Sequence, residues 1–312
     1  MQADQDALAR GLAVSNKLRS AAQNRGEDTR LVQMRFAQER LLARLQSGKY
    51  RNRFLLKGGL MFSCKSTASS RPTDDIDLHD DSGLGLQNIA RAVHESAGMS
   101  LGDGIEYDLS SFKATPIREA GSPGIRVVMN AAIGRSIVHV KLDMCTGDPI
   151  TPAPVTRMLP SSLPKDFEPV AFQSYPWETA LAEKIHAVTK FGLDSTRMKD
   201  WYDIAAIGQQ EEIDGLTLCA AIRRTFDWRG DVDVDPSPEG LSDDLVSAKA
   251  ADYERHVADF DAPESRATLE RAMETCRSLM LPALEAVHEG RDLDQEWSPE
   301  RGWSGAYQIV MS

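Results

Sequence analysis

The sequence has few cysteines and no long apolar run. Its four cysteines, Cys64, Cys145, Cys219 and Cys276, are far apart and form no C-x-x-C pair. This spacing argues against a structural zinc site and against a disulfide framework, and it favours a reduced environment. No apolar run approaches the roughly 18 residues of a membrane span, and the first residues lack the basic-then-apolar order of a secretory signal. We therefore expect a cytoplasmic protein with no membrane partner.

Several catalytic motifs are also missing. The sequence contains no H-E-x-x-H, and its six histidines do not pair at metal-ligand spacing. It contains no G-x-S-x-G and no G-x-x-x-x-G-K-[ST]. These absences argue against zinc proteases, serine hydrolases of the nucleophile-elbow type and P-loop NTPases.

Charge is present in quantity but unevenly spread. The net charge is −11, yet residues 1–57 carry twelve Lys/Arg against five Asp/Glu, whereas residues 231–312 carry seven against nineteen. Because phosphate contacts are local, the basic segment predicts an RNA-binding arm in which Arg40, Arg44, Lys49 and Arg51 contact phosphates. An amphipathic helix that is rich in arginine and merely solvated explains the same pattern equally well.

Hydrophobic periodicity predicts three regions: basic helices over residues 1–50, a core over 51–175 and a helical C-terminal domain over 176–312. The core is expected to contain strands at 54–56, 74–78, 105–112, 125–133 and 137–144, and a helix at 84–97. Gly121–Gly124 and Gly134-Arg135 are typical of hairpin turns, which favours antiparallel pairing of the last three strands. The proline-rich residues 147–176 predict a connector with little regular structure. A core-facing stripe predicts a final long helix from Leu269 to Val287.

Two carboxylates and a glycine pair stand out as candidate chemistry. Asp75 and Asp77 alternate with Ile76 and Leu78, so both carboxylates should leave one face of a strand. Neighbouring carboxylates repel each other, and a divalent metal ion is the usual remedy. Gly58-Gly59 ends the first strand, and with a short helix over residues 60–65 it could present backbone N–H groups to a polyphosphate. Taken singly, an ordinary turn explains the glycines and a solvated strand edge explains the aspartates.

The order of these features resembles the polymerase-beta type of nucleotidyltransferase fold. It is most similar to the AbiEii/AbiGii nucleotidyltransferase toxins of type IV toxin–antitoxin systems. Three stretches carry the resemblance: FLLKGGLMF at 54–62, RPTDDIDL at 71–78 and AEKIHAVTKFGLDSTRMKDWYDI at 182–204. The resemblance implies an α/β (α+β) fold, in which a small mixed sheet with flanking helices is followed by a helical C-terminal domain that completes the active site.

The resemblance also implies roles for individual residues. Asp75 and Asp77 would hold two Mg²⁺ ions that bridge the phosphates of an NTP, and Lys184 would neutralise triphosphate charge. Asp203 would be the catalytic acidic residue of the later helix, although Asp200 lies three positions away on that helix. The nucleotide would also be bound by Lys57, Gly58, Gly59, Thr73 and Lys199.

Asp143 is a further candidate, because in the wider fold a third metal-binding carboxylate comes from a later strand. The alternative for Asp143 is the exposed polar side of an edge strand. We expect His186 to serve packing, and we expect Trp201 and Tyr202 to pack against the strand layer, with base stacking as the other interpretation.

The activity that the resemblance implies is transfer of a nucleoside monophosphate from an NTP to RNA, with the 3′ end of tRNA as the acceptor. Such a toxin would block translation and would have a cognate antitoxin as a partner. Nucleotidylylation of a protein and a non-catalytic regulatory module of the same fold remain as alternatives. Label from an NTP that follows RNase-sensitive or protease-sensitive material would separate the two acceptors, and metal-dependent NTP turnover would test the third interpretation.

Overall fold

The computed structural model of the chain describes residues 2–64, 73–119, 122–258, 260 and 268–305. The chain divides into two compact units. The first comprises Met1–Gly147 with Val155–Ser174, and the second comprises Asp148–Pro154 with Tyr175–Ser312. Across the described ranges, no helix combines the length and hydrophobicity that crossing a membrane requires.

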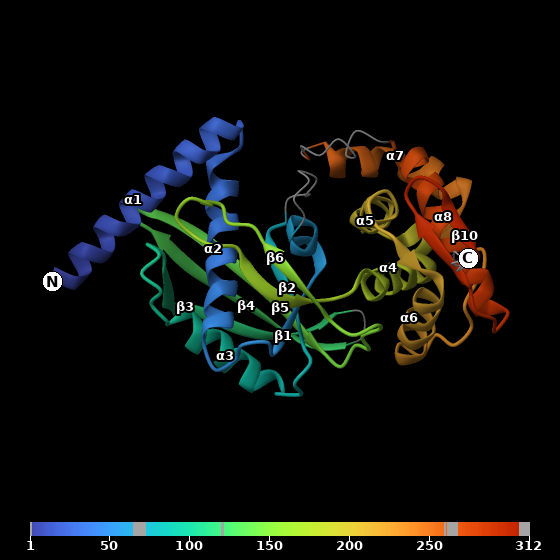
Figure 1. Cartoon of the computed structure of the whole chain (residues 1–312), viewed down its shortest axis with the longest axis horizontal. Helices are drawn as coiled ribbons and strands as arrows, with labels where there is room; N and C mark the ends of the chain where they lie inside the picture. The colour runs from blue at the N-terminus through green and yellow to red at the C-terminus, as the bar shows by residue number, and fades with distance from the viewer. Residues whose placement is uncertain (1, 65–72, 120–121, 259, 261–267, 306–312) are drawn as a thin grey trace, which may run out of the picture. The chain divides into compact units, whose positions relative to one another are not determined.

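A seven-stranded mixed sheet forms the centre of the first unit (Figure 1). The strand order is β3-β4-β5-β2-β1-β7-β6. The pairs β2–β5 and β1–β7 are parallel, and the other four neighbouring pairs are antiparallel. The strands are β1 (Phe54–Lys57), β2 (Asp75–Asp80), β3 (Glu106–Glu119), β4 (Ser122–Ile133), β5 (Ser136–Thr146), β6 (Val155–Leu159) and β7 (Val170–Ser174). Together with the helices described below, this sheet confirms the predicted mixed α/β fold.

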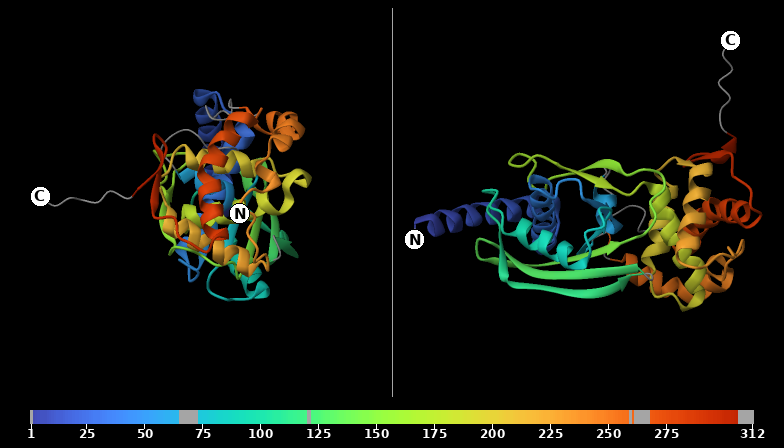
Figure 2. Two further views of the ribbon diagram at one scale, coloured as in Figure 1. Left: turned by 90° about the vertical axis from the view of Figure 1, so that its right-hand side faces the viewer. Right: turned by 90° about the horizontal axis from the view of Figure 1, so that it is seen from below.

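Three helices accompany the sheet in the first unit: α1 (Gln2–Arg25), α2 (Thr29–Ser47) and α3 (Leu86–Ala97). The Asp28 side chain caps the N-terminus of α2, and Gly48 ends that helix as predicted. The helix α2 lies against the sheet (Figures 1 and 2), and the Tyr107 hydroxyl of β3 donates to the Ala37 carbonyl of α2 at 2.6 Å. The apolar side of α2, including Phe36 and Leu41, is buried.

The strands alternate as the sequence predicts. Ile76 and Leu78 of β2 are buried in the apolar core, and their neighbours Asp75 and Asp77 point to the opposite face. The three predicted strands over residues 105–144 form two antiparallel hairpins, and Gly134-Arg135 is the turn between β4 and β5. One face of the sheet therefore packs against apolar side chains, while the other carries charge.

Two local expectations for this unit are wrong, and a third is confirmed in part. The proline-rich connector contains the paired strands β6 and β7, because its prolines lie outside these two strands. Of the expected turn Gly121–Gly124, Ser122–Gly124 belong to β4 instead, and Gly121 lies outside the described residues. The expected helix over residues 60–65 is a 3₁₀-helix that begins at Gly58 and runs to Cys64; Lys65, like Arg71 and Pro72 of the aspartate motif, lies outside the described residues.

The expected RNA contacts of Arg40 and Arg44 are also wrong. Both side chains are buried and bind Asp103: Arg40 Nε lies 2.8 Å from Oδ2, and Arg44 Nη1 and Nη2 lie 2.7 and 2.9 Å from Oδ2 and Oδ1. Burial alone would raise the pKa of Asp103, but the two guanidinium groups outweigh it and hold that pKa below its usual value. We call these three residues the arginine cluster. Lys49 pairs with Glu95 at the surface.

The second unit is mainly helical, as predicted. Its helices are α4 (Trp177–Phe191), α5 (Lys199–Gly208), α6 (Gly215–Trp228), α7 (Asp243–Val257) and α8 (Leu269–His288), with 3₁₀-helices η2 (Gly192–Asp194) and η3 (Glu239–Leu241). The predicted stripe of α8 is buried. The unit also contains a three-stranded sheet that the sequence analysis did not anticipate: β8 (Ile213–Asp214), β9 (Gln295–Ser298) and β10 (Gly302–Gly305).

Candidate active site

Three carboxylates converge on the charged face of the first unit's sheet. The parallel register of β2 and β5 pairs Asp77 with Asp143, and it pairs Asp75 with Lys141. One oxygen from each of Asp75, Asp77 and Asp143 lies within 4.8 Å of the others. We call these three residues the carboxylate cluster. Carboxylate oxygens are the ligands that Mg²⁺ prefers, so this donor set fits a hard divalent cation.

Asp143 is not on an edge strand. Its strand β5 lies between β4 and β2, well inside the sheet, and the residue is buried. The interpretation of Asp143 as the polar side of an exposed edge is therefore wrong. The structure brings Asp143 to Asp75 and Asp77 instead.

Lys141 and Arg126 bind members of the carboxylate cluster. Lys141 Nζ lies 2.8 Å from Asp75 Oδ2 and 3.6 Å from Asp143 Oδ2. Arg126 of β4 donates to both oxygens of Asp143, from Nε at 2.8 Å and from Nη2 at 2.7 Å. Partial burial alone would lower the pKa of Lys141, but its bond to Asp75 and the charge of Asp143 outweigh burial and raise that pKa.

The first of the two glycines has a conformation and a position that exclude other residues. Gly58 follows β1 with φ +66°, in the left-handed region that glycine adopts without cost. A Cβ at this position would lie 2.0 Å from Asp77 Oδ2, far inside van der Waals contact. The backbone of the Gly58-Gly59 turn therefore lies directly beside the Asp77 carboxylate.

Thr73 and its neighbours hold the start of β2. The Thr73 hydroxyl donates to Asp75 Oδ1 at 3.2 Å, which links the residue to the carboxylate cluster. The buried Gln38 of α2 donates from Nε2 to the Thr73 carbonyl at 3.1 Å. The helix α2 thus holds the backbone just before the aspartate motif.

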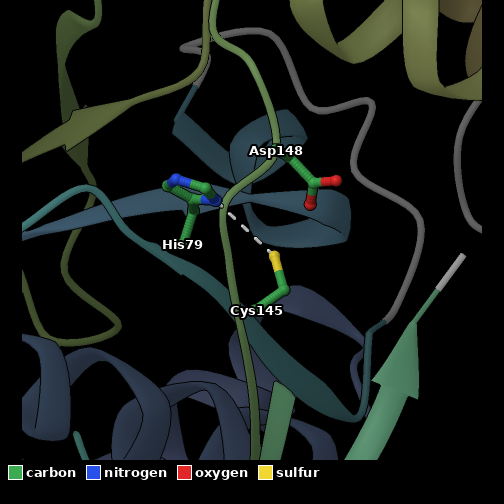
Figure 3. A group of neighbouring side chains, drawn as sticks. All are labelled: His79, Cys145 and Asp148. Atoms are coloured by element: carbon green, nitrogen blue, oxygen red, sulfur yellow. Dashed lines mark hydrogen bonds between the residues drawn. The ribbon is translucent and has the colours of Figure 1, made fainter. Parts of the chain in front are cut away.

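Beyond Asp77 and Asp143, the same face of the sheet continues with His79 and Cys145, which are register partners in β2 and β5. Cys145 Sγ lies 3.7 Å from His79 Nδ1 (Figure 3) and 3.3 Å from the ammonium of the buried Lys57. Figure 3 also labels Asp148, the first residue of the segment assigned to the second unit. Cys145 forms no disulfide bond, and neither do the other three cysteines, all of which lie within the described ranges.

The second unit contains its own lysine–carboxylate group. Lys184 of α4 donates to Asp203 Oδ2 at 2.6 Å and to Asp200 Oδ1 at 3.1 Å, and both aspartates of α5 are buried. Arg197 Nε binds the other oxygen of Asp200 at 2.8 Å. Burial alone would raise the pKa of Asp200, but the charges of Lys184 and Arg197 outweigh it and hold that pKa below its usual value. Lys199, the first residue of α5, is half-buried.

The remaining candidates have structural contacts. Trp201 is buried and donates from Nε1 to the Gly240 carbonyl at 2.9 Å, and Tyr202 is buried beside the ring of Phe260. Both therefore pack within the second unit, and their burial does not support base stacking. His186 packs edge-on against the Phe226 ring, as expected. Its two ring nitrogens also have polar partners: Nε2 lies 2.7 Å from Asp231 Oδ2, and Nδ1 lies 3.0 Å from Arg229 Nη1.

The sequence analysis did not identify Arg126 and Gln38. Arg126 could have been found, because counting back from the two-residue turn Gly134-Arg135 pairs it with Asp143. No local signal identifies Gln38, whose contact with Thr73 joins residues that are 35 positions apart.

Comparison with known proteins places the chain in a family. The family model described as "Nucleotidyl transferase AbiEii toxin, Type IV TA system" matches residues 40–287. No curated protein sequence matches the chain. Among solved structures, the chain is similar to MenT4, a nucleotidyltransferase toxin of Mycobacterium tuberculosis, with 19% identity and a TM-score of 0.49 over 88% of this chain and 98% of that one.

It is also similar to JHP933 from Helicobacter pylori, with 12% identity and a TM-score of 0.47 over 84% of this chain and 94% of that one. The family model spans most of the sequence, including the carboxylate cluster and the Lys184 group. The chain therefore belongs to the AbiEii family of nucleotidyltransferase toxins of type IV toxin–antitoxin systems.

Proposed function

We propose that this protein transfers a nucleoside monophosphate from an NTP to the 3′ end of an RNA, with tRNA as the acceptor, and releases pyrophosphate. The observation that carries the proposal is the carboxylate cluster, whose oxygens lie within 4.8 Å of one another. Family membership supports the reaction class. Modification of the 3′ end would prevent aminoacylation, which would account for toxicity.

The carboxylate cluster fits a divalent metal site. Three acidic side chains that share one face repel one another, and their oxygens match the preference of Mg²⁺. We assign Asp75 and Asp77 as ligands of two Mg²⁺ ions and Asp143 as a third ligand. Bound Mg²⁺ would stabilise the charge that develops on the triphosphate as pyrophosphate leaves.

We assign nucleotide binding to residues around Asp77. Gly58 and Gly59 would offer backbone N–H groups to phosphate oxygens, because no side chain separates this turn from the carboxylate. Lys57 would add positive charge, and Thr73, which already binds Asp75, would orient the nucleotide. In the reaction the acceptor hydroxyl loses its proton to solvent and its oxygen bonds to the α-phosphorus. The bond from this phosphorus to the oxygen that bridges to the β-phosphate breaks, and pyrophosphate leaves with that electron pair.

Family resemblance supports roles for the second lysine–carboxylate group. Lys184 would neutralise the triphosphate as a compact cation, and Lys199 would assist it. Asp203 is fully buried and lies 2.6 Å from the Lys184 ammonium, which supports a positioning role exerted through that lysine. We expect Asp203→Asn to reduce transfer more than Asp200→Asn, since Asp200 also has Arg197 as a partner.

The proposed partners are an NTP, an RNA and the antitoxin that the family name implies. Support for RNA from the basic N-terminal segment is weaker than the sequence suggested, because Arg40 and Arg44 are committed to Asp103. The reaction consumes NTP, so we expect the protein to act in the cytoplasm.

A labelling experiment tests the proposal. The protein is incubated with each NTP labelled at the α-phosphate, Mg²⁺ and total RNA, and samples are digested with RNase or protease. The proposal predicts label that is RNase-sensitive, resists protease and requires Mg²⁺, and sequencing of the 3′ ends identifies the acceptor. Label in protease-sensitive material would instead indicate nucleotidylylation of a protein.

A further inference from the structure

Lys141 lies between two members of the carboxylate cluster. Its ammonium contacts Asp75 Oδ2 at 2.8 Å and Asp143 Oδ2 at 3.6 Å. The parallel register of β2 and β5 fixes this arrangement, because it pairs Lys141 directly with Asp75 and places Asp143 two residues further along β5. The lysine therefore approaches the cluster from within the same sheet face.

Lys141 and Arg126 differ in how firmly they are held at the carboxylate cluster. Arg126 forms two parallel hydrogen bonds to the two oxygens of Asp143, an arrangement that fixes a guanidinium in one orientation. Lys141 has one short contact, at 2.8 Å from Asp75 Oδ2, and its four-carbon side chain is flexible. The lysine can therefore leave without dismantling the sheet.

A lysine ammonium and a divalent cation compete for the same oxygens. The cluster oxygens lie within 4.8 Å of one another, and a Mg²⁺ ion needs oxygens at about 2.0–2.1 Å. An ammonium that contacts Asp75 and Asp143 occupies the volume through which such an ion would reach them. Positive charge is needed there in either case, because adjacent carboxylates repel one another.

We propose that Lys141 is an exchangeable counter-ion of the carboxylate cluster. Its ammonium neutralises Asp75 and Asp143 before the divalent cation binds, leaves them when the cation enters, and then contacts a phosphate oxygen of the nucleotide. This inference rests on the proposed function, which supplies the metal and the NTP. It assigns a role to Lys141 that is separate from that of Arg126, which stays on Asp143.

Binding of Mn²⁺ in the absence of nucleotide tests the exchange. Free Mn²⁺ is measured by electron paramagnetic resonance during titration of the wild type and the variants Lys141→Met and Lys141→Gln, with circular dichroism to verify folding. Lys113→Met is the matched control, because it removes one positive charge from an exposed position on the edge strand β3. Asp77→Asn reports whether Mn²⁺ binds at the carboxylate cluster at all.

We expect both Lys141 variants to bind Mn²⁺ about fivefold more tightly than the wild type, because the competing ammonium is gone. The control should stay within about twofold of the wild type. At saturating metal, the Lys141 variants should have a KM for NTP that is raised about tenfold, since a ground-state contact is lost.

Two results would overturn the inference, and they differ in scope. If Asp77→Asn abolishes Mn²⁺ binding but the Lys141 variants bind Mn²⁺ no more tightly than the wild type, the exchange is wrong and the proposed metal site stands. If Asp77→Asn leaves Mn²⁺ binding unchanged, the metal site of the proposed function fails, and the exchange fails with it.

Discussion

The first unit contains two groups of oppositely charged side chains that differ in how completely they are satisfied. In the arginine cluster, Asp103 and the Arg44 side chain are each only 2% exposed. In the carboxylate cluster, the cations Lys141 and Arg126 are 34% and 43% exposed. Similar residue types thus form a buried ion pair in the arginine cluster and a solvent-accessible group in the carboxylate cluster.

Within the arginine cluster, the Arg44 guanidinium leaves no N–H group for a ligand to bind. Arg44 donates from Nε to the Met99 carbonyl, from Nη1 to the Arg40 carbonyl and Asp103, and from Nη2 to Asp103 and the Ile105 carbonyl. All five N–H groups of the guanidinium therefore have partners within the protein. A buried ion pair that is this complete holds α2 to the segment before β3, and its role is structural.

If the accessible carboxylate cluster is the active site and the buried arginine cluster is structural, Asp77→Asn should have the largest effect on nucleotide transfer. Loss of a metal-binding carboxylate should reduce nucleotide transfer by about 10⁴-fold or more. The free energy of unfolding should stay constant or rise, because the substitution relieves repulsion within the carboxylate cluster. Transfer assays and urea denaturation measure the two quantities, and undiminished transfer would show that the site is misassigned.

For Arg44→Met, loss of stability should dominate. The substitution leaves Asp103 buried with one of its two guanidinium partners, which should lower the free energy of unfolding by about 3–5 kcal/mol. Transfer per folded molecule should be retained. Lys49→Met is the surface control and should leave the urea midpoint unchanged. An Arg44→Met protein that is stable but deficient in RNA binding would restore the RNA-arm interpretation.

Gly58→Ala should reduce transfer by about 10²-fold, because the new Cβ displaces the Asp77 carboxylate with which it would collide. Gly83→Ala is a matched control. Gly83 has the same φ of +66°, yet a Cβ there would have no neighbour within 4 Å. Both variants carry the same backbone strain, so equal transfer by the two would refute a role for the Gly58–Asp77 contact.

A smaller effect is the loss of stability at low pH that the buried His186 of the second unit should cause. Burial lowers the pKa of His186 to about 4. The hydrogen bond to Asp231 raises this pKa and the charge of Arg229 lowers it, but burial has the largest effect. The folded protein therefore keeps His186 neutral while the unfolded chain protonates it near pH 6.5. Stability is fully present above pH 6.5 and should fall by about 2 kcal/mol as the pH drops toward 4. Thermal unfolding of wild type and His186→Gln checks this, and parallel pH profiles would contradict it.

Local pattern predicted much of the fold and part of the site. Alternation of Asp75 and Asp77 with apolar residues identified β2 and the face of its carboxylates, because strand geometry depends on neighbouring residues alone. The turn at Gly134-Arg135 was likewise predicted. The strands β6 and β7 were missed, because the prolines that flank them dominate the composition of that segment.

Partners across the fold could not be predicted in the same way. Arg40 and Arg44 have the appearance of a phosphate-binding pair in sequence, and only the distant Asp103 shows that they are neutralised. The central position of Asp143 depends on the parallel pairing of β5 with β2, which no turn connects. Contacts between residues far apart in the sequence therefore decide whether Arg40 and Arg44 can bind a ligand. They also decide whether Asp143 joins the candidate active site.

The central claim is that the carboxylate cluster supports nucleotidyl transfer, and the fate of the phosphates tests it most directly. Wild type and Asp77→Asn are incubated with Mg²⁺, total RNA and either α-labelled or γ-labelled NTP. The account predicts that wild type puts the α-label on RNA and releases the γ-label as pyrophosphate, and that Asp77→Asn does neither. Transfer of γ-label to the acceptor, or equal α-label transfer by both proteins, would contradict it.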